Sequence, residues 1–182
     1  MSSDTCQLCI ALGESDIHSL SASLQRATRL ADLVEIRLDK LQGWDVSQLL
    51  ALASSTTSPL IFSLRKKSHG GSFSGSEEER FDLLSKVLSI IKPSFVDIEA
   101  DTPEEIILAL QALSPETRWI ISWHVMDETP ADLEALFDKV SRLPAAYYKI
   151  ATMSQSIIDA IRMLKFTKKI NQDRPRLCGI CM

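Results

Sequence analysis

Short apolar runs of strand length alternate with longer amphipathic stretches of helix length along most of this 182-residue sequence. The runs that predict strands are Cys6–Leu12, Leu33–Leu38, Leu60–Leu64, Phe95–Ile98, Trp119–Trp123, Tyr147–Met153 and Arg176–Met182. The stretches that predict helices are about Ile17–Leu30, Val46–Ala53, Ser76–Ile91, Pro103–Leu113, Pro130–Arg142, and one from Ser154 with apolar Ile157, Ile158, Ile161 and Leu164. One unit takes about 25 to 30 residues, which predicts parallel strands joined by right-handed crossovers.

A doubly wound sheet and a (β/α)₈ barrel both have this period. The barrel typically takes about 250 residues, and this α/β sequence offers seven strand-like runs without an eighth. The sequence therefore predicts either an incomplete barrel or an open sheet. Because 45% of the residues are apolar, we expect residues 1–182 to form a single domain with its own core.

The formal net charge of −4 gives no support for nucleic acid or an anionic membrane surface as a partner. No apolar run is long enough to span a membrane. The first residues, Met1 to Thr5, lack the basic and apolar regions of a signal peptide, so a cytoplasmic location is the default expectation.

The four cysteines form two Cys-x-x-Cys pairs, which superficially resemble halves of a zinc site. Both pairs, Cys6 with Cys9 and Cys178 with Cys181, lie in apolar runs that predict strands. Residues i and i+3 of a strand point to opposite faces, so neither pair can chelate as a unit. We expect buried, reduced thiols and no metal.

Polar side chains recur at the carboxyl end of five successive predicted strands. Pairs that share a strand face are Glu35 with Arg37, Ser63 with Arg65, Asp97 with Glu99, and Ser122 with His124, while Lys149 has Ala151 beside it. A single charged strand end is commonly a solvated edge or an ion pair. Five in succession favour a functional constellation, because the strand ends of a barrel converge on one mouth.

The residue types at these strand ends suggest a reaction. Lys149, in an apolar strand, is either a lysine whose head reaches water or an amine nucleophile with a depressed pKa that forms a Schiff base with a ketone. His124 is the natural proton shuttle. Arg37 and Arg65 can hold an anionic or hydroxylated substrate and disfavour the proton of Lys149, and Glu35 can orient an arginine or bind a hydroxyl.

Several of these segments together resemble the type I 3-dehydroquinate dehydratases. They are Asp32 to Asp39 (DLVEIRLD), Ile61 to Arg65 (IFSLR) followed by Gly70 and Gly71, Ile121 to His124 (ISWH) followed by Thr129 and Pro130, and Lys149 to Met153 (KIATM). The run Gly70 to Gly75 with Glu79 and Arg80 is similar to the dehydratases fused to shikimate dehydrogenase. The resemblance covers nearly the whole chain.

The resemblance implies a (β/α)₈ barrel and a hydro-lyase of the shikimate pathway that converts 3-dehydroquinate to 3-dehydroshikimate. The family's Schiff-base lysine matches Lys149 and its acid/base histidine matches His124, while its substrate-binding residues match Glu35, Arg37 and Arg65. It implies no cofactor and no metal. It leaves open whether the chain forms a homodimer or is fused to a shikimate dehydrogenase domain.

Two departures from the family pattern stand out. His69 occupies the place of a glutamate that is expected to hold the catalytic imidazole, and a histidine supplies no fixed negative charge. The sequence also ends at Met182, before the family's further substrate-binding arginine, lid loop and eighth strand. We therefore expect a longer polypeptide, such as the first part of a bifunctional enzyme. The rival interpretations are another Schiff-base barrel lyase or aldolase, and a non-catalytic barrel fragment.

Overall fold

A computed structural model describes residues 7–172 and 176–182 of the chain. Strands and helices alternate along it, with one short 3₁₀ turn, η1, between the third strand and the third helix. The elements are β1 (Cys9–Leu12), α1 (Ile17–Ala27), β2 (Leu33–Arg37), α2 (Val46–Ser54), β3 (Leu60–Ser63), η1 (Lys67–His69), α3 (Glu77–Ile91), β4 (Phe95–Glu99), α4 (Glu104–Leu113), β5 (Arg118–Val125), α5 (Leu133–Val140), β6 (Tyr147–Thr152), α6 (Ile157–Gln172) and β7 (Leu177–Cys181).

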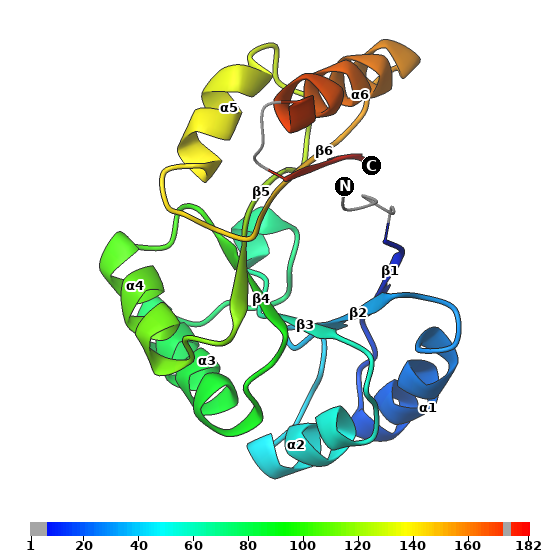
Figure 1. The fold of residues 1–182 in the computed structure, drawn as a ribbon, viewed down its shortest axis with the longest axis vertical. Coiled ribbons are helices and arrows are strands. Elements are labelled where there is room, and N and C mark those ends of the chain that lie inside the picture. Colours follow the sequence, from blue (N-terminus) through cyan, green and yellow to red (C-terminus); the bar gives the residue numbers. More distant parts are fainter. Residues whose placement is uncertain (1–6, 173–175) are drawn as a thin grey trace.

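The strands form one parallel sheet in the order β1-β2-β3-β4-β5-β6-β7, so every strand pairs with its neighbours in sequence. The sheet is curved and the helices cover its outer side (Figure 1). A doubly wound sheet places helices on both faces, so this arrangement decides for the incomplete barrel. Within the described residues, β1 and β7 are the two outer strands, and each pairs on one side only.

The two faces of the sheet have different neighbours. Alternate strand residues such as Val34, Phe62 and Ile98 are fully buried against the helices, where they form the main core. The opposite, concave face carries a smaller apolar cluster of Leu33, Ile61, Phe95 and Ile120 near the amino ends of the strands. Because side chains alternate along a strand, residues two and four positions further on face the same side. The polar residues at the carboxyl ends of the strands therefore lie on the same face as this small cluster, which forms the apolar floor beneath them.

Local signals explain most helix boundaries. The Ser76 hydroxyl accepts a hydrogen bond from the backbone N–H of Glu79, and the Glu79 carboxylate accepts one from the backbone N–H of Ser76, so the predicted capping box opens α3. The prediction of a helix from Pro130 was wrong by three residues, because the carboxylate of Asp132 caps the helix and α5 begins at Leu133. Helix α1 likewise ends at Ala27 rather than Leu30. Strand β1 begins at Cys9, while Cys6 lies outside the described residues.

The outer strands correct one expectation about burial, and the last helix exposes the apolar residues that marked it. The thiols of Cys9 and Cys178 are exposed and that of Cys181 is partly exposed, because β1 and β7 are outer strands of the described sheet. On α6 the apolar residues that marked the helix face solvent, with Ile157 75% and Leu164 70% exposed. Met163 and Phe166 are the residues of α6 that enter the core. No helix of the described part is both long and apolar enough to cross a bilayer.

Candidate active site

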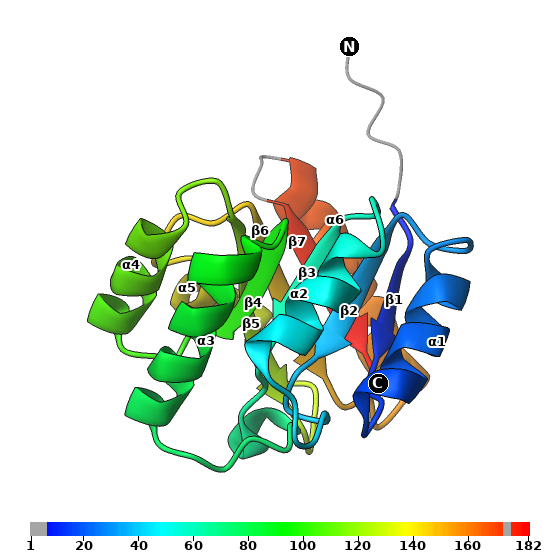
Figure 2. The ribbon, with the colours of Figure 1, turned by 90° about the horizontal axis from the view of Figure 1, so that it is seen from below.

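The polar strand ends predicted from the sequence meet on the concave face, one layer above the apolar floor. The register places Ser122 of β5 beside Lys149 of β6, and Asp97 of β4 beside Ser63 of β3. In Figure 2 the carboxyl ends of the strands point toward the lower edge, where the turn η1 also lies. Barrel enzymes keep their reacting groups at this end.

Lys149 is held as an ammonium ion between two carboxylates. Its Nζ lies 3.1 Å from Oδ2 of Asp97 and 3.4 Å from Oε2 of Glu35. Burial by itself lowers the pKa of Lys149, but the charges of Asp97 and Glu35 outweigh burial and raise it above its ordinary value. The prediction of a depressed pKa was therefore wrong for the substrate-free protein, because it considered the nearby arginines and gave the carboxylate of Asp97 no role.

Arg65 connects the carboxylates to the rest of the site, and it is only 2% exposed. Its two terminal nitrogens reach both oxygens of Asp97, at 3.1 and 2.9 Å, and Nη1 also donates to the hydroxyl of Ser122 at 2.8 Å. Burial opposes the charge, yet the Asp97 carboxylate raises the pKa of Arg65 further above its ordinary value. The guanidinium is therefore a permanent cation at the centre of the site.

His124 lies against the same guanidinium. Its Nδ1 is 3.3 Å from Nη1 of Arg65. A guanidinium can only donate, so Nδ1 is the accepting nitrogen and the ring proton is on Nε2. Burial, followed by the positive charge of Arg65, lowers the pKa of His124 to about 3, although Asp97 acts in the opposite direction. The imidazole of His124 is therefore neutral at neutral pH.

The remaining predicted residues occupy the rim. Arg37 forms two 2.8 Å hydrogen bonds with the carboxylate of Asp39. The same carboxylate accepts from the backbone N–H groups of Arg65 and Ser72, at 3.3 and 2.9 Å. Asp39 thus ties Arg37 to the loop after β3. His69, predicted as an auxiliary residue, is buried on η1 beside His124, with 5.9 Å between the ring centroids.

Sequence reasoning gave no role to three residues that organise the site. Asp97 is fully enclosed and contacts Lys149, Arg65 and Ser122. Burial favours its neutral form, but Arg65 and Lys149 hold the pKa of Asp97 well below its usual range. Behind it, Glu99 forms an ion pair with Arg80 of α3, and Arg80 also donates to the carbonyl of Leu64 at 3.0 Å. The position of Asp97 and Glu99 at a strand end was the available signal.

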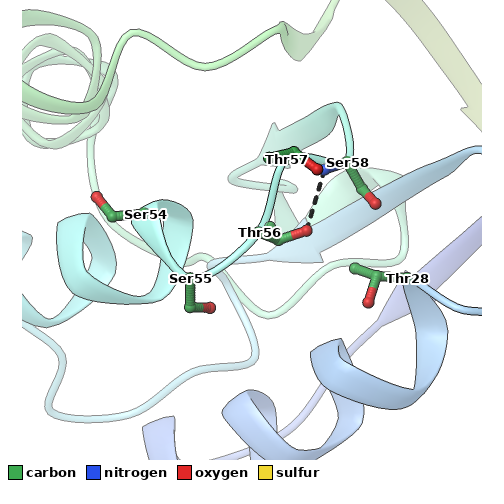
Figure 3. A pocket seen from close by; sticks show the side chains of 6 residues that line it. All are labelled: Thr28, Ser54, Ser55, Thr56, Thr57 and Ser58. Carbon is green, nitrogen blue, oxygen red and sulfur yellow. Dashed lines mark hydrogen bonds between the residues drawn. The ribbon is translucent and has the colours of Figure 1, made fainter.

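A surface hollow lies away from this cluster, at the amino end of the sheet. It has a volume of about 360 Å³ between the end of α1 and the connection from α2 to β3. Only hydroxyl-bearing residues line it, namely Thr28 and the run from Ser54 to Ser58 (Figure 3). Across the described residues no group of three or more His, Cys, Asp or Glu side chains is placed to hold a metal ion.

Fold and site together define the chain as a (β/α)-barrel protein, open on one side, with a lysine, a histidine and paired carboxylates at its mouth. A family model for type I 3-dehydroquinase matches residues 8–182. The chain belongs to the type I 3-dehydroquinase family.

Individual relatives agree with this membership. The chain is 35% identical over 143 residues to the 3-dehydroquinate dehydratase of Dehalococcoides mccartyi, covering 77% of this chain and 61% of that protein. It is 30% identical over 167 residues to the bifunctional 3-dehydroquinate dehydratase/shikimate dehydrogenase of Arabidopsis thaliana, covering 89% of this chain and 28% of that protein. The chain therefore spans only part of the length of these relatives.

Among solved structures, the 3-dehydroquinate dehydratase of Enterococcus faecalis superposes with a TM-score of 0.85. The superposition covers 97% of this chain and 78% of that one, at 22% sequence identity. At this identity the likeness establishes the fold. It shows that the seven described strands correspond to a large part of a dehydratase barrel.

Proposed function

We propose that the natural polypeptide carrying this sequence is a 3-dehydroquinate dehydratase, a hydro-lyase that forms 3-dehydroshikimate and water through a Schiff base on Lys149. The supporting observation is the placement of Lys149 and His124 on the paired strands β5 and β6, joined through Asp97 and Arg65. Residues 1–182 contribute to one barrel domain in this proposal. Glu35, Arg37 and Arg65 bind the substrate, and His69 is auxiliary.

The reaction begins at Lys149, which must first lose a proton because its ammonium is paired with two carboxylates. The free amine adds to the C3 carbonyl of 3-dehydroquinate, and loss of water gives an iminium ion. The positive nitrogen draws electrons from the C2–H bond, so His124 can remove that proton and leave an enamine. The lysine thereby acts as a covalent electron sink.

The second half of the reaction is the elimination of the C1 hydroxyl, driven by the electrons of the enamine. The enamine pair forms the C1–C2 double bond as the C1–O bond breaks, and His124 gives its proton to the departing hydroxyl, which leaves as water. Hydrolysis of the remaining imine restores the Lys149 amine and releases 3-dehydroshikimate. One histidine takes and returns the proton on one face of the substrate, so the elimination is syn.

The neutral state of His124 suits this role, since a neutral imidazole can accept a proton and later donate it. Its accepting nitrogen, Nδ1, is occupied by Arg65 in the substrate-free protein. The proposal therefore requires Arg65 to exchange this contact for one with a substrate oxygen before the C2 proton is removed. Arg65 is suited to that exchange because a guanidinium can donate hydrogen bonds to both carboxylate and hydroxyl oxygens.

The test is reductive trapping in the full natural polypeptide. Borohydride added with 3-dehydroquinate should reduce the iminium, inactivate the enzyme and add the mass of the reduced adduct to the peptide that contains Lys149. Lys149→Met should abolish trapping and lower turnover by several orders of magnitude. Lys66→Met, at another lysine of the mouth, is the matched control and should still trap.

Labelling of another lysine, or no labelling at all, would contradict the proposal. Trapping with a sugar-phosphate ketone but not with 3-dehydroquinate would instead identify a different Schiff-base lyase. Both outcomes are read directly from peptide masses.

A further inference from the structure

His69 makes two hydrogen bonds that fix the position of its only ring proton. Its Nδ1 accepts from the backbone N–H of His124 at 3.2 Å. On the other side of the ring, Nε2 lies 3.2 Å from Oδ2 of Asp101. A backbone N–H can only donate, so Nδ1 carries a lone pair and the proton is on Nε2, facing Asp101.

The bond to His124 replaces a missing strand contact. Strand β4 ends at Glu99, whose partner is Ser122, whereas β5 continues to Val125. On the β4 side, the backbone of His124 therefore lies beyond the last paired residue. A backbone N–H that is partly shielded from water needs an acceptor, and the imidazole of His69 supplies it.

The ring of His69 is itself held firmly. It is 5% exposed and meets the rings of both Trp123 and His124 edge-on, with centroids 5.2 and 5.9 Å away. The backbone N–H of His69 bonds the carbonyl of Lys66 at 3.0 Å, and Gly70 follows in the left-handed region with a φ of 75°. The turn thus presents the imidazole to β5 in one orientation.

Asp101 provides the negative charge of this arrangement. Its Oδ1 lies 2.6 Å from Nζ of Lys66, while its other oxygen faces His69. Partial burial favours the neutral acid, but the hydrogen bonds from His69 and Lys66 hold the pKa of Asp101 well below its usual range. The carboxylate therefore stays ionised and selects the tautomer of His69 that has its proton on Nε2.

We propose that Asp101 and His69 form a positioning pair for His124, and this proposal rests on the proposed dehydratase function. The fixed charge that His69 cannot carry is supplied one hydrogen bond further out, by Asp101. Through His69 it anchors the end of β5, so that the imidazole of His124 is held in one position, within reach of the substrate bound to Lys149. Neither member of the pair touches the reacting atoms.

The kinetic experiment compares five variants of the full natural polypeptide. His69→Phe keeps a ring but loses both bonds, and kcat should fall about 10-fold to 100-fold, by analogy with the loss of a hydrogen-bond partner behind a metal-bound histidine, with KM changed less than about twofold. His69→Gln should restore most of kcat, because its amide oxygen can accept from His124 while its amide nitrogen donates to Asp101. Lys67→Gln, at an exposed position of the same turn, is the control and should match the wild type.

Asp101→Leu and the double variant test whether His69 and Asp101 act together. Asp101→Leu should lower kcat by a similar factor to His69→Phe, and the double variant should be no worse than either alone, because residues that act as a unit are not additive. Additive losses would overturn the pairing. Retention of full kcat by His69→Phe would overturn the positioning role.

Two measurements without substrate separate this proposal from the proposed function. Nitrogen-15 NMR of the imidazole should show Nε2 of His69 protonated and Nδ1 unprotonated, and the amide of His124 should be protected from hydrogen exchange in the wild type and in His69→Gln but not in His69→Phe. A protonated Nδ1, or equal exchange in all variants, would overturn the pair. A wild-type protein that fails to dehydrate 3-dehydroquinate would refute the proposed function alone, while these spectra still decide on the pair.

Discussion

The Asp97 carboxylate contacts Nζ of Lys149 and Nη2 of Arg65 through the same oxygen, Oδ2, at 3.1 and 2.9 Å. This buried anion therefore bridges two cations that would otherwise repel each other, and Glu35 adds a second negative charge beside both of them. This arrangement makes the charged layer stable in the absence of substrate, and it also keeps Lys149 protonated. The chemistry of an amine nucleophile requires that this pairing be loosened.

We predict that Asp97→Asn lowers the pKa of Lys149. Without the anion, burial and the charge of Arg65 both disfavour the ammonium. The pH dependence of Lys149 modification by an amine-selective reagent, followed by peptide mass, should shift to lower pH. Glu35→Gln should shift it in the same direction. An unchanged midpoint in both variants would show that the carboxylates do not control the protonation of the lysine.

The second prediction concerns stability and pH. Since the pKa of His124 is lowered to about 3 in the folded protein and is about 6.5 in an unfolded chain, the unfolded state binds more protons between these values. The contribution of His124 to the free energy of unfolding is therefore fully present above about pH 6.5 and is lost as the pH falls toward 3. Urea denaturation at several pH values should show this slope in the wild type and a flatter one in His124→Gln.

The third prediction addresses the support behind the site. Arg80 is 1% exposed and forms an ion pair with buried Glu99. Arg80→Met removes one cation of that carboxylate and leaves Nη1 of Arg65 at 3.5 Å, so we expect a loss of about 3 kcal/mol in the free energy of unfolding, the lower end of the range for breaking a buried ion pair. Adding Glu99→Gln should recover part of the loss by removing the partly compensated charge. If the single variant lost less than about 1 kcal/mol in urea denaturation, the pair would not stabilise the fold.

The fourth prediction concerns Gly71, where the loop after η1 passes close to the site. A Cβ added there would lie 2.0 Å from the backbone oxygen of Arg65. Because a backbone atom cannot move aside like a flexible side chain, Gly71→Ala should displace the loop and lower both the melting temperature and kcat. Gly13→Ala, where the nearest atom is a side-chain carbon 3.5 Å away, is the matched control. Equal behaviour of the two variants would contradict this account.

The fifth prediction follows from the exposed apolar surface of the described structure. Leu8, Ile157, Ile158 and Leu164 are more than half exposed, and β1 and β7 have one unpaired side each within the described sheet. A polypeptide limited to residues 1–182 should therefore self-associate and bind the dye ANS. Size-exclusion chromatography and dye fluorescence measure both properties. A monomer that binds no dye and melts sharply would contradict the expectation.

The sequence predicted the order and direction of the strands because apolar runs and helix stretches alternate clearly in it. It also predicted which residues reach the mouth, since Glu35, Arg65, His124 and Lys149 share one face by the two-residue period of a strand. The sequence did not predict which charged side chains form ion pairs with one another. Which carboxylate meets Lys149 depends on the curvature of the sheet and on side-chain rotamers, which no local pattern encodes.

The exposure of residues on the two outer strands could not be predicted from the sequence either. The alternation of Cys178 and Cys181 predicted opposite faces correctly, because Cys178 pairs with inward-facing Lys149 and Cys181 with Thr152. Their exposure depends on which strand lies at the edge of the sheet. The role of Asp101 was also hidden, since its contact with His69 joins a loop to a turn 32 positions earlier in the chain.

The strand order has a consequence for the kinetics of folding. Each strand pairs with its sequence neighbours, whereas Glu35 and Lys149, 114 positions apart, meet only when five successive strands have assembled. Until then their charges remain in water, so the free-energy cost of removing them from water arises late in folding. Substitutions in the charged layer should consequently change the rate of unfolding far more than the rate of folding. The reacting groups therefore lie outside the folding nucleus and stabilise the sheet only after it has assembled.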